Sequence, residues 1–320
     1  MNKATKKILV KYVAAPLLLL VLLYLIYKQI QSKGSLSEQW LELKQHWHSG
    51  SALLILIALF LSPLNWLTEA KKWHLLLQKV ETVSYRTALA STFTGMAFAL
   101  VTPNKIGDFA GRILYVKNNN KLRAIIATII NNISQVIITF ITGIIGLTYL
   151  NIYHPGNWQL LALIAAIVSS TLLLWMYFRI DLVATWVEKK RSLRRVVVTI
   201  RVLKRYQRKD LLQVLFIALF RFIIYNIQFV LFIKIFGADI SFLIALLLSA
   251  AMFWLITIIP SIFVADLGVR AFISNLLFVN TGLVANSVTI IAGSYMIWLL
   301  NWAIPATIGA VLVLTVKWFK

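Results

Sequence analysis

The sequence contains no cysteine, so disulfides, thiolate metal sites and cysteine nucleophiles are all excluded. Charged residues make up only 13% of the chain, about half the share usual in soluble domains. Among the charged residues the acidic ones are the minority, with 10 Asp and Glu against 32 Lys and Arg. No Gly-rich phosphate loop, serine nucleophile elbow or pair of catalytic carboxylates is visible. We therefore expect neither a soluble catalytic domain nor a cofactor.

Apolar residues are abundant instead. They form 60% of the 320 residues, and the mean hydropathy is +0.84. Many of them lie in runs close to the roughly 20 residues that a helix needs to cross a bilayer. The sequence therefore predicts an all-α polytopic membrane protein, with a single transmembrane domain over residues 1–320 and about six to eight transmembrane helices.

The formal net charge of +22 could suggest a nucleic-acid partner, but the basic residues lie at the ends of apolar runs. That distribution is typical of cytoplasmic loops facing anionic lipid. The densest basic stretch, residues 180–210, predicts a cytoplasmic loop in which Val196–Val198 and Leu203 favour an amphipathic surface helix. We expect no nucleic acid, membrane lipids as partners, and both termini on the cytoplasmic side of a bacterial inner membrane. A homo-oligomer is left open.

Six long spans are predicted, the first being a retained signal anchor. They are Ile8–Tyr27, Ser51–Thr68, Ile125–Leu150, Gln159–Phe178, Leu211–Ile233 and Val284–Val316, the last of which could instead be two shorter segments.

Two apolar runs differ from these spans. Thr87–Val101 is too short to cross comfortably and has basic residues on both flanks. Ile240–Ile259 is followed by only a short apolar stretch before Asn280. Each run predicts a re-entrant hairpin, the first entered from the cytoplasm and the second from outside. Irregular backbone at such depth is tolerated where protein or a cavity surrounds it.

Both predicted hairpins carry the same charged pattern. A proline is followed by Asp108 and Arg112 in the first hairpin, and by Asp266 and Arg270 in the second. An Asp and an Arg four residues apart lie on one helix face and can pair. Charges within a membrane are costly and usually functional. The alternative is that each pair only caps and stabilises its own hairpin.

The opposite entry sides of the two hairpins indicate an inverted-topology repeat. The first repeat covers about residues 51–179 and the second about 211–316, joined by the basic loop 180–210. Many secondary transporters build a substrate site near the membrane midplane from such repeats.

Residues 102–112 resemble the Pro-Gly-x-x-Gly-Glu-x-x-Arg signature of a flippase-like membrane family. That family includes the transmembrane region of lysylphosphatidylglycerol synthases. Ile259-Pro260 with Leu267–Arg270 resemble its second signature, Pro…Gly-Leu-Gly-Val-Arg-Glu. The resemblance covers most of the chain. It implies the lipid-translocating half alone, because residues 1–320 contain no counterpart of the soluble aminoacyl-transfer domain of the synthases.

The chain departs from the family pattern at several positions. Asp108 stands where the family usually has Glu, Asp266 where it often has Gly, and Ala271 where it often has Glu. Asn131 and Asn132 lie where a Glu-Arg pair is expected. These departures imply a divergent branch with a different substrate.

The predicted site binds an anionic lipid head group. Arg112 and Arg270 would take phosphate oxygens, because Arg offers a fixed fork of donors. Asp108 and Asp266 would hold each Arg until substrate arrives. Arg221, near the middle of its span, is expected to face a cavity. The predicted site residues are Asn104, Lys105, Asp108, Arg112, Arg221, Asp266 and Arg270.

Other polar residues are interpreted more simply. Glu69 and Lys72 are expected to form a surface pair at the cytoplasmic end of a helix. His46 and His48 lack a third ligand, so no metal site is predicted. Most of six tryptophans are expected to mark membrane interfaces: Trp40, Trp47, Trp66, Trp73, Trp158 and Trp318.

The favoured function is a flippase-like transporter for an anionic-headgroup lipid, either a phospholipid or a polyprenyl-phosphate-linked carrier. One alternative is an integral membrane enzyme acting on lipid-linked substrates, such as a head-group transferase. Another is a partner subunit that recruits a soluble enzyme through the basic segment Lys189–Lys209.

Overall fold

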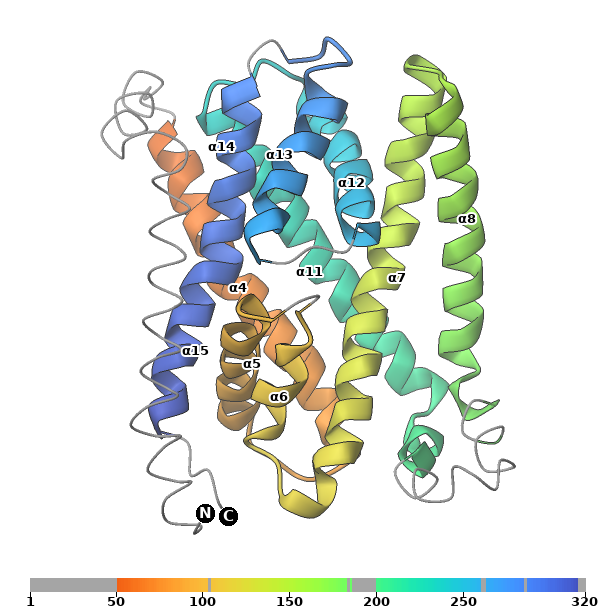
Figure 1. The fold of residues 1–320 in the computed structure, drawn as a ribbon, viewed down its shortest axis with the longest axis vertical. Coiled ribbons are helices and arrows are strands. Elements are labelled where there is room, and N and C mark those ends of the chain that lie inside the picture. Colours follow the sequence, from red (N-terminus) through yellow and green to blue (C-terminus); the bar gives the residue numbers. More distant parts are fainter. Residues whose placement is uncertain are drawn as a thin grey trace.

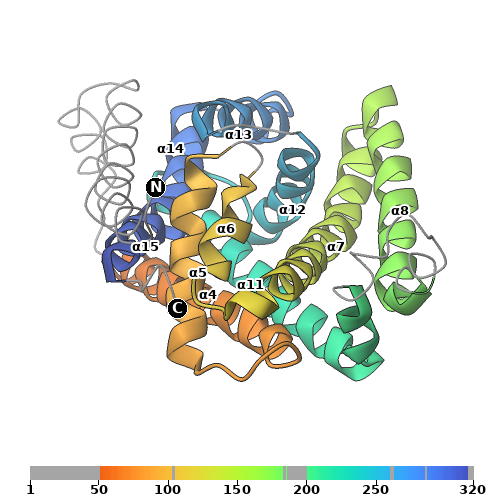
Figure 2. The same cartoon turned by 60° about the horizontal axis from the view of Figure 1, so that its bottom comes forward.

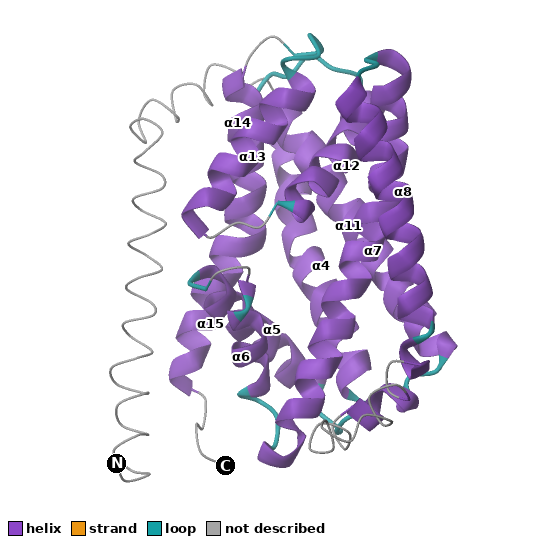
Figure 3. Cartoon of the chain, turned by 45° about the vertical axis from the view of Figure 1, so that its right-hand side comes forward, coloured by secondary structure: helices purple, strands orange, loops and turns teal. Residues whose placement is uncertain are grey.

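The computed structural model describes residues 51–102, 105–182, 185, 200–259, 263–284 and 287–315 (Figure 1). These residues form helices, turns and connecting segments, with no strand among them (Figure 3). The predicted all-α class is confirmed. Several sequence predictions fall outside the described residues, namely those for Ile8–Tyr27, Trp40, His46, Trp47, His48, Asn104, Val196–Val198 and Trp318.

Long helices form the frame of the molecule. They are α4 (Ser51–Leu77), α7 (Lys121–Tyr153), α8 (Asn157–Phe178), α11 (Arg208–Ile235), and the continuous run of α14 (Ser287–Trp298), η6 (Leu299–Ala303) and α15 (Ile304–Thr315). In the described part of the chain, five helical segments of 22 to 36 residues are long and apolar enough to cross a membrane. The chain is therefore a multi-pass membrane protein.

Shorter helices lie within this frame. They are α5 (Tyr85–Leu100), α6 (Gly107–Ile113), α12 (Phe242–Ile258) and α13 (Phe263–Phe278), with 3-10 turns η3 (Asn118–Asn120) and η5 (Arg201–Arg205). Figure 2 shows α8 at the edge of the bundle beside α7, away from both pairs of short helices.

Two boundaries refine the sequence predictions. Helix α4 continues to Leu77, beyond the predicted end at Thr68, because Trp73 and Leu75–Leu77 extend its apolar pattern. The final segment is one continuous helical run rather than two separate helices, with a π turn at Leu299–Ala303. Pro305 has no N–H to donate to the carbonyl of the residue four before it, which favours the wider turn.

The short helices form two hairpins. The C-terminal end of α5 and the N-terminal end of α6 point to mid-height from one end of the bundle (Figure 1). The corresponding ends of α12 and α13 point to mid-height from the opposite end (Figure 1). Helices α5 and α12 have 16 and 17 residues, so each rises about 25 Å, less than the roughly 30 Å of a bilayer core. Their lengths fit re-entrance, which stays a prediction.

Glycines let the hairpins approach the frame closely. A Cβ added at Gly309 of α15 would lie 1.9 Å from the carbonyl oxygen of Phe93 on α5. One added at Gly146 of α7 would lie 2.2 Å from the carbonyl oxygen of Leu247 on α12. Small residues allow such backbone contact between membrane helices. Each hairpin is therefore seated against a long helix by a position that no larger residue fits.

Basic residues gather at the end of the bundle that bears the α4–α5 and α6–α7 connections (Figure 1). The connections at the opposite end, residues 154–156, 236–241 and 279–286, contain no Lys or Arg. This asymmetry agrees with a cytoplasmic basic end, which stays a prediction. The predicted surface role of Leu203 is wrong, because that side chain packs in the protein core. The neighbouring Tyr206 hydroxyl donates to the carbonyl of Leu76 at 3.1 Å.

Candidate functional site

The two Asp-x-x-x-Arg motifs each form an ion pair on one helix face. On α6, Arg112 Nε donates to Asp108 Oδ1 at 2.7 Å. On α13, Arg270 Nε donates to Asp266 Oδ2 at 2.9 Å. All four side chains are buried. The pairing predicted from the four-residue spacing is confirmed at both positions.

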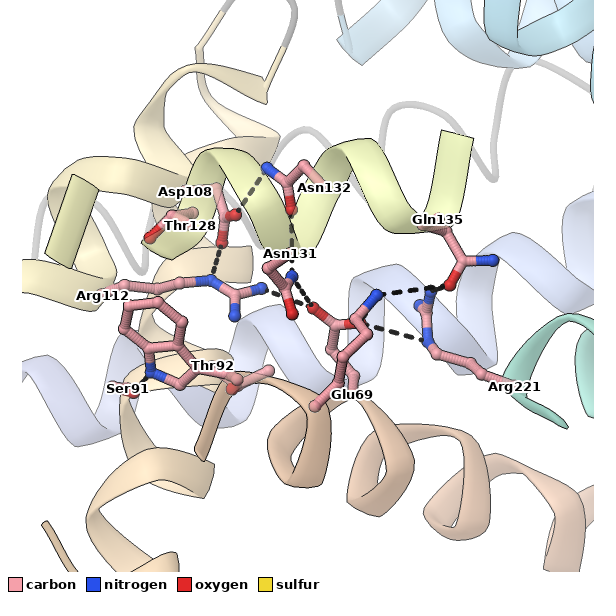
Figure 4. Close-up of polar contacts among 12 residues, drawn as sticks. Glu69, Ser91, Thr92, Asp108, Arg112, Thr128, Asn131, Asn132, Gln135 and Arg221 are labelled. Atoms are coloured by element: carbon pink, nitrogen blue, oxygen red, sulfur yellow. Dashed lines mark hydrogen bonds and ion pairs between the residues drawn. The ribbon is translucent and has the colours of Figure 1, made fainter. Parts of the chain in front are cut away.

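Glu69 of α4 is the centre of a buried charge network (Figure 4). Its Oε1 accepts hydrogen bonds from Arg112 Nη2 at 2.8 Å and from Asn131 Nδ2 at 2.7 Å. Its Oε2 lies 3.1 Å from Lys72 Nζ and 3.5 Å from Arg221 Nε. One carboxylate thus contacts three cations, which is how a membrane protein can keep such charges buried.

The predicted location of the Glu69–Lys72 pair is wrong, although the pairing itself is correct. Glu69 is 4% exposed and Lys72 is 0% exposed, so the pair lies in the interior and not at a surface. The apolar residues that continue α4 to Leu77 were the signal in the sequence. Because the helix extends two turns past Glu69, the acid does not lie at the end of the helix.

Helix α7 completes the network with three amide side chains. Asn132 Nδ2 donates to Asp108 Oδ2 at 3.3 Å, while Asn131 reaches Glu69. One turn further, Gln135 Oε1 accepts from Arg221 Nη1 at 3.0 Å. The two asparagines that depart from the family pattern therefore contact the carboxylates of the site directly. Gln135 was missed because a lone amide in an apolar helix carries no motif.

Trp73 supports Arg112 from the other side. The Arg112 guanidinium carbon lies 5.2 Å from the centre of the Trp73 ring, within cation–π range. The indole Nε1 donates to Ser91 Oγ at 2.8 Å. The ring is fully buried, so Trp73 is an exception among the tryptophans expected mostly to mark membrane interfaces. The ring thus packs beside the arginine of the first hairpin.

Lys105, just before α6, differs from the other cations. Its backbone has a φ of 58°, a left-handed conformation that is uncommon for residues other than glycine. Its ammonium lies 4.0 Å from the centre of the Trp302 ring. Among the described residues, no carboxylate lies within ion-pair distance of Lys105. In the part of the chain that the structure describes, the first hairpin therefore presents a cation that rests on an aromatic ring and forms no direct ion pair.

These residues line one cavity of about 600 Å³ between the two hairpins. Six predicted site residues lie on its wall, and Asn104 lies outside the described residues. Those six are Lys105, Asp108, Arg112, Arg221, Asp266 and Arg270. The wall also includes residues that sequence reasoning did not assign to the site, among them Glu69, Lys72, Gln135, Tyr225 and Trp302.

The cavity wall is both charged and apolar. Among the described residues, five cations and three carboxylates lie on this wall, an excess of two positive charges. Its apolar residues come mostly from α5, α7, α11 and α12, and include Met96, Val136, Phe222, Phe253, Ile256 and Ile259. A cavity of this kind suits a molecule with an anionic group and an apolar part.

Comparison with known protein families assigns the chain to one of them. The family model of the lysylphosphatidylglycerol synthase transmembrane region matches residues 8–309. The chain belongs to this family. Membership confirms the resemblance seen in the two signatures and makes the chain a membrane protein of a family linked to lipid handling. No curated protein matches the sequence.

Proposed function

We propose that the protein moves a lipid with an anionic head group across the bacterial cytoplasmic membrane. The observation that carries this proposal is the cavity of about 600 Å³, lined by both hairpin ion pairs, with its excess of two positive charges and its apolar wall. Membership of a family linked to lipid handling supports the same substrate class.

The cavity addresses the main barrier to lipid movement. A head group must cross roughly 30 Å of hydrocarbon, where a charge without partners is very costly. Arg221 and Arg270 line the cavity wall and can replace part of the lost hydration. The acyl chains can meanwhile remain against apolar surface. The protein then lowers the barrier without supplying chemical energy at the site.

The two hairpins could give the cavity access to both leaflets of the membrane. We interpret them as re-entrant halves of an inverted repeat, residues 51–179 and 211–316. Each half begins with a long helix, a hairpin and a second long helix, and the first half adds α8. The hairpins reach the cavity from opposite ends (Figure 1). Small movements of one hairpin or the other would open the cavity toward one leaflet at a time.

A proteoliposome assay tests the proposal. Vesicles contain fluorescent phospholipids, and an impermeant dithionite-type quencher is added outside. We expect the inner-leaflet signal to decay faster than in protein-free vesicles. Arg221→Gln should reduce the gain by about tenfold or more, because a charge-assisted hydrogen bond to the head group is lost. The matched control is Arg208→Gln, the same change at an exposed position of the same helix.

Two results would contradict the proposal. Movement of no lipid class, with or without an ion gradient, would favour the partner-subunit alternative. Chemical modification of the lipid head group in the same vesicles, detected by mass spectrometry, would favour a membrane enzyme.

A further inference from the structure

The charges in the cavity do not balance, and their positions show where the excess lies. Asp108 and Glu69 both contact Arg112, at 2.7 and 2.8 Å, so this guanidinium has two carboxylate partners. Arg270 has its own carboxylate in Asp266 at 2.9 Å. Buried charges are tolerated when they are paired. The uncompensated positive charge therefore belongs to the remaining cations.

Two of those cations are the least compensated. Lys105 has no carboxylate of the described residues within ion-pair distance and rests over Trp302. Arg221 lies 3.5 Å from an oxygen of Glu69 that Lys72 already occupies at 3.1 Å. Both line the same cavity. An anion entering it would gain most by binding these two side chains.

Lys105 also links the two hairpins electrostatically. It belongs to the first hairpin, yet Asp266 and Arg270 of the second hairpin and Arg221 of α11 are among the charges close enough to act on its ammonium. A ligand bound at Lys105 would therefore lie near Arg221 and near the Asp266–Arg270 ion pair of the second hairpin. Arg112, with two carboxylates and Trp73 around it, is better suited to holding the first hairpin in place.

We propose that the cavity selects a phosphate group carrying two negative charges, as in a phosphomonoester or a diphosphate, over the single charge of a phosphodiester. Lys105 and Arg221 are its ligands, and Arg112 is a positioning residue. For a lipid substrate this rests on the proposed function, and it names the head-group class. A phosphomonoester carries about −1.5 to −2 at pH 7 because its second pKa is about 6, which matches the excess of two charges in the cavity.

Binding to the purified full-length protein tests this without transport. The probes are short-chain phosphatidic acid as the monoester, short-chain phosphatidylglycerol as the diester, and inorganic phosphate. At pH 8 we expect the monoester to bind about tenfold more tightly than the diester, because it gains one more charge-assisted contact. At pH 5 the monoester carries one charge, so the preference should disappear.

Substitutions locate the effect. Lys105→Gln should reduce the preference at pH 8 to less than about threefold, since the unpaired charge is gone. Lys105→Arg keeps the charge and should retain the preference, which separates charge loss from damage to the strained turn. Lys117→Gln is the matched control, because Lys117 is exposed and does not line the cavity.

The outcomes separate this inference from the transport proposal. Equal binding of monoester and diester at pH 8, or an unchanged preference in Lys105→Gln, would overturn the inference even if the vesicles show lipid movement. Inorganic phosphate binding as tightly as the lipid monoester would support a phosphate-dianion site and assign it to the free anion. In that case absence of lipid movement would overturn only the transport proposal.

Discussion

The two hairpins carry the same motif in different surroundings. Arg112 of the first hairpin is held by Asp108 on its own helix, by Glu69 on α4 and by the ring of Trp73. Arg270 of the second hairpin pairs with Asp266 on its own helix, and its other hydrogen bond, to Tyr225, is 3.5 Å long. The motif thus specifies a local ion pair, while neighbouring helices decide how firmly each hairpin is held.

Packing shows the same contrast. A Cβ at Gly111 would lie 2.5 Å from the carbonyl oxygen of Thr94 and 2.6 Å from Gly95 Cα, so the arms of the first hairpin touch backbone to backbone. A Cβ at Gly268 of the second hairpin would meet no described atom within 4 Å. We therefore expect the first hairpin to be the more rigid and the second to be the more mobile of the two.

The largest expected effect tests whether the two hairpins enter the membrane from opposite sides. Each introduced cysteine should either be labelled from outside the cell or not be labelled at all. Because the chain has no cysteine, single cysteines can be introduced at Asn119, His154 and Asn280. An impermeant thiol reagent applied to intact cells should label positions 154 and 280 and leave 119 unlabelled. Labelling at 119 from outside would rule out the first re-entrant hairpin. Labelling at 280 only after permeabilisation would rule out the second.

A smaller effect compares the two arginines. Arg112→Gln should lower the free energy of unfolding by about 3–5 kcal/mol, because two buried carboxylates lose a partner. Arg270→Gln should cost less, about 1–3 kcal/mol, because it leaves one carboxylate short of a partner. Equilibrium unfolding in detergent measures the free energy of unfolding of both variants. The control Arg208→Gln, at an exposed position, should change that free energy by less than about 0.5 kcal/mol.

Lipid-dependent stabilisation sharpens the same comparison. If both arginines serve one site, each variant loses the stabilisation given by bound lipid, and the double variant loses no more than either single one. If each only stabilises its own hairpin, the losses of stability add and lipid still stabilises the protein. Equal costs for the two single variants would remove the proposed difference between the hairpins.

The smallest effect comes from adding one methyl group. Gly111→Ala should destabilise the protein by about 1–3 kcal/mol, because the arms of the first hairpin must separate. Gly268→Ala has open space and lies within a helix, so it should stabilise by about 0.5–1 kcal/mol. Thermal unfolding of both variants decides the sign. A destabilising Gly268→Ala would show that the second hairpin is packed as closely as the first.

Much of the fold follows from local sequence patterns. Long apolar runs predicted the long helices, and the short run Thr87–Val101 predicted the first hairpin helix, found at Tyr85–Leu100. The four-residue spacing predicted both Asp–Arg pairs, because such residues share one helix face whatever surrounds the helix. Family membership was also readable from two short signatures.

The sequence by itself determined the helices, the two ion pairs and the excess of positive charge. Only the tertiary structure decided that Glu69 and Lys72 are buried, that one carboxylate joins three cations, and that Lys105 has an aromatic partner instead of an acidic one. The physical reason is that helix geometry depends on neighbours three or four residues away. The burial and partners of a charge depend instead on helices 40 to 200 residues distant along the chain, as the Arg112–Glu69 and Lys105–Trp302 contacts show.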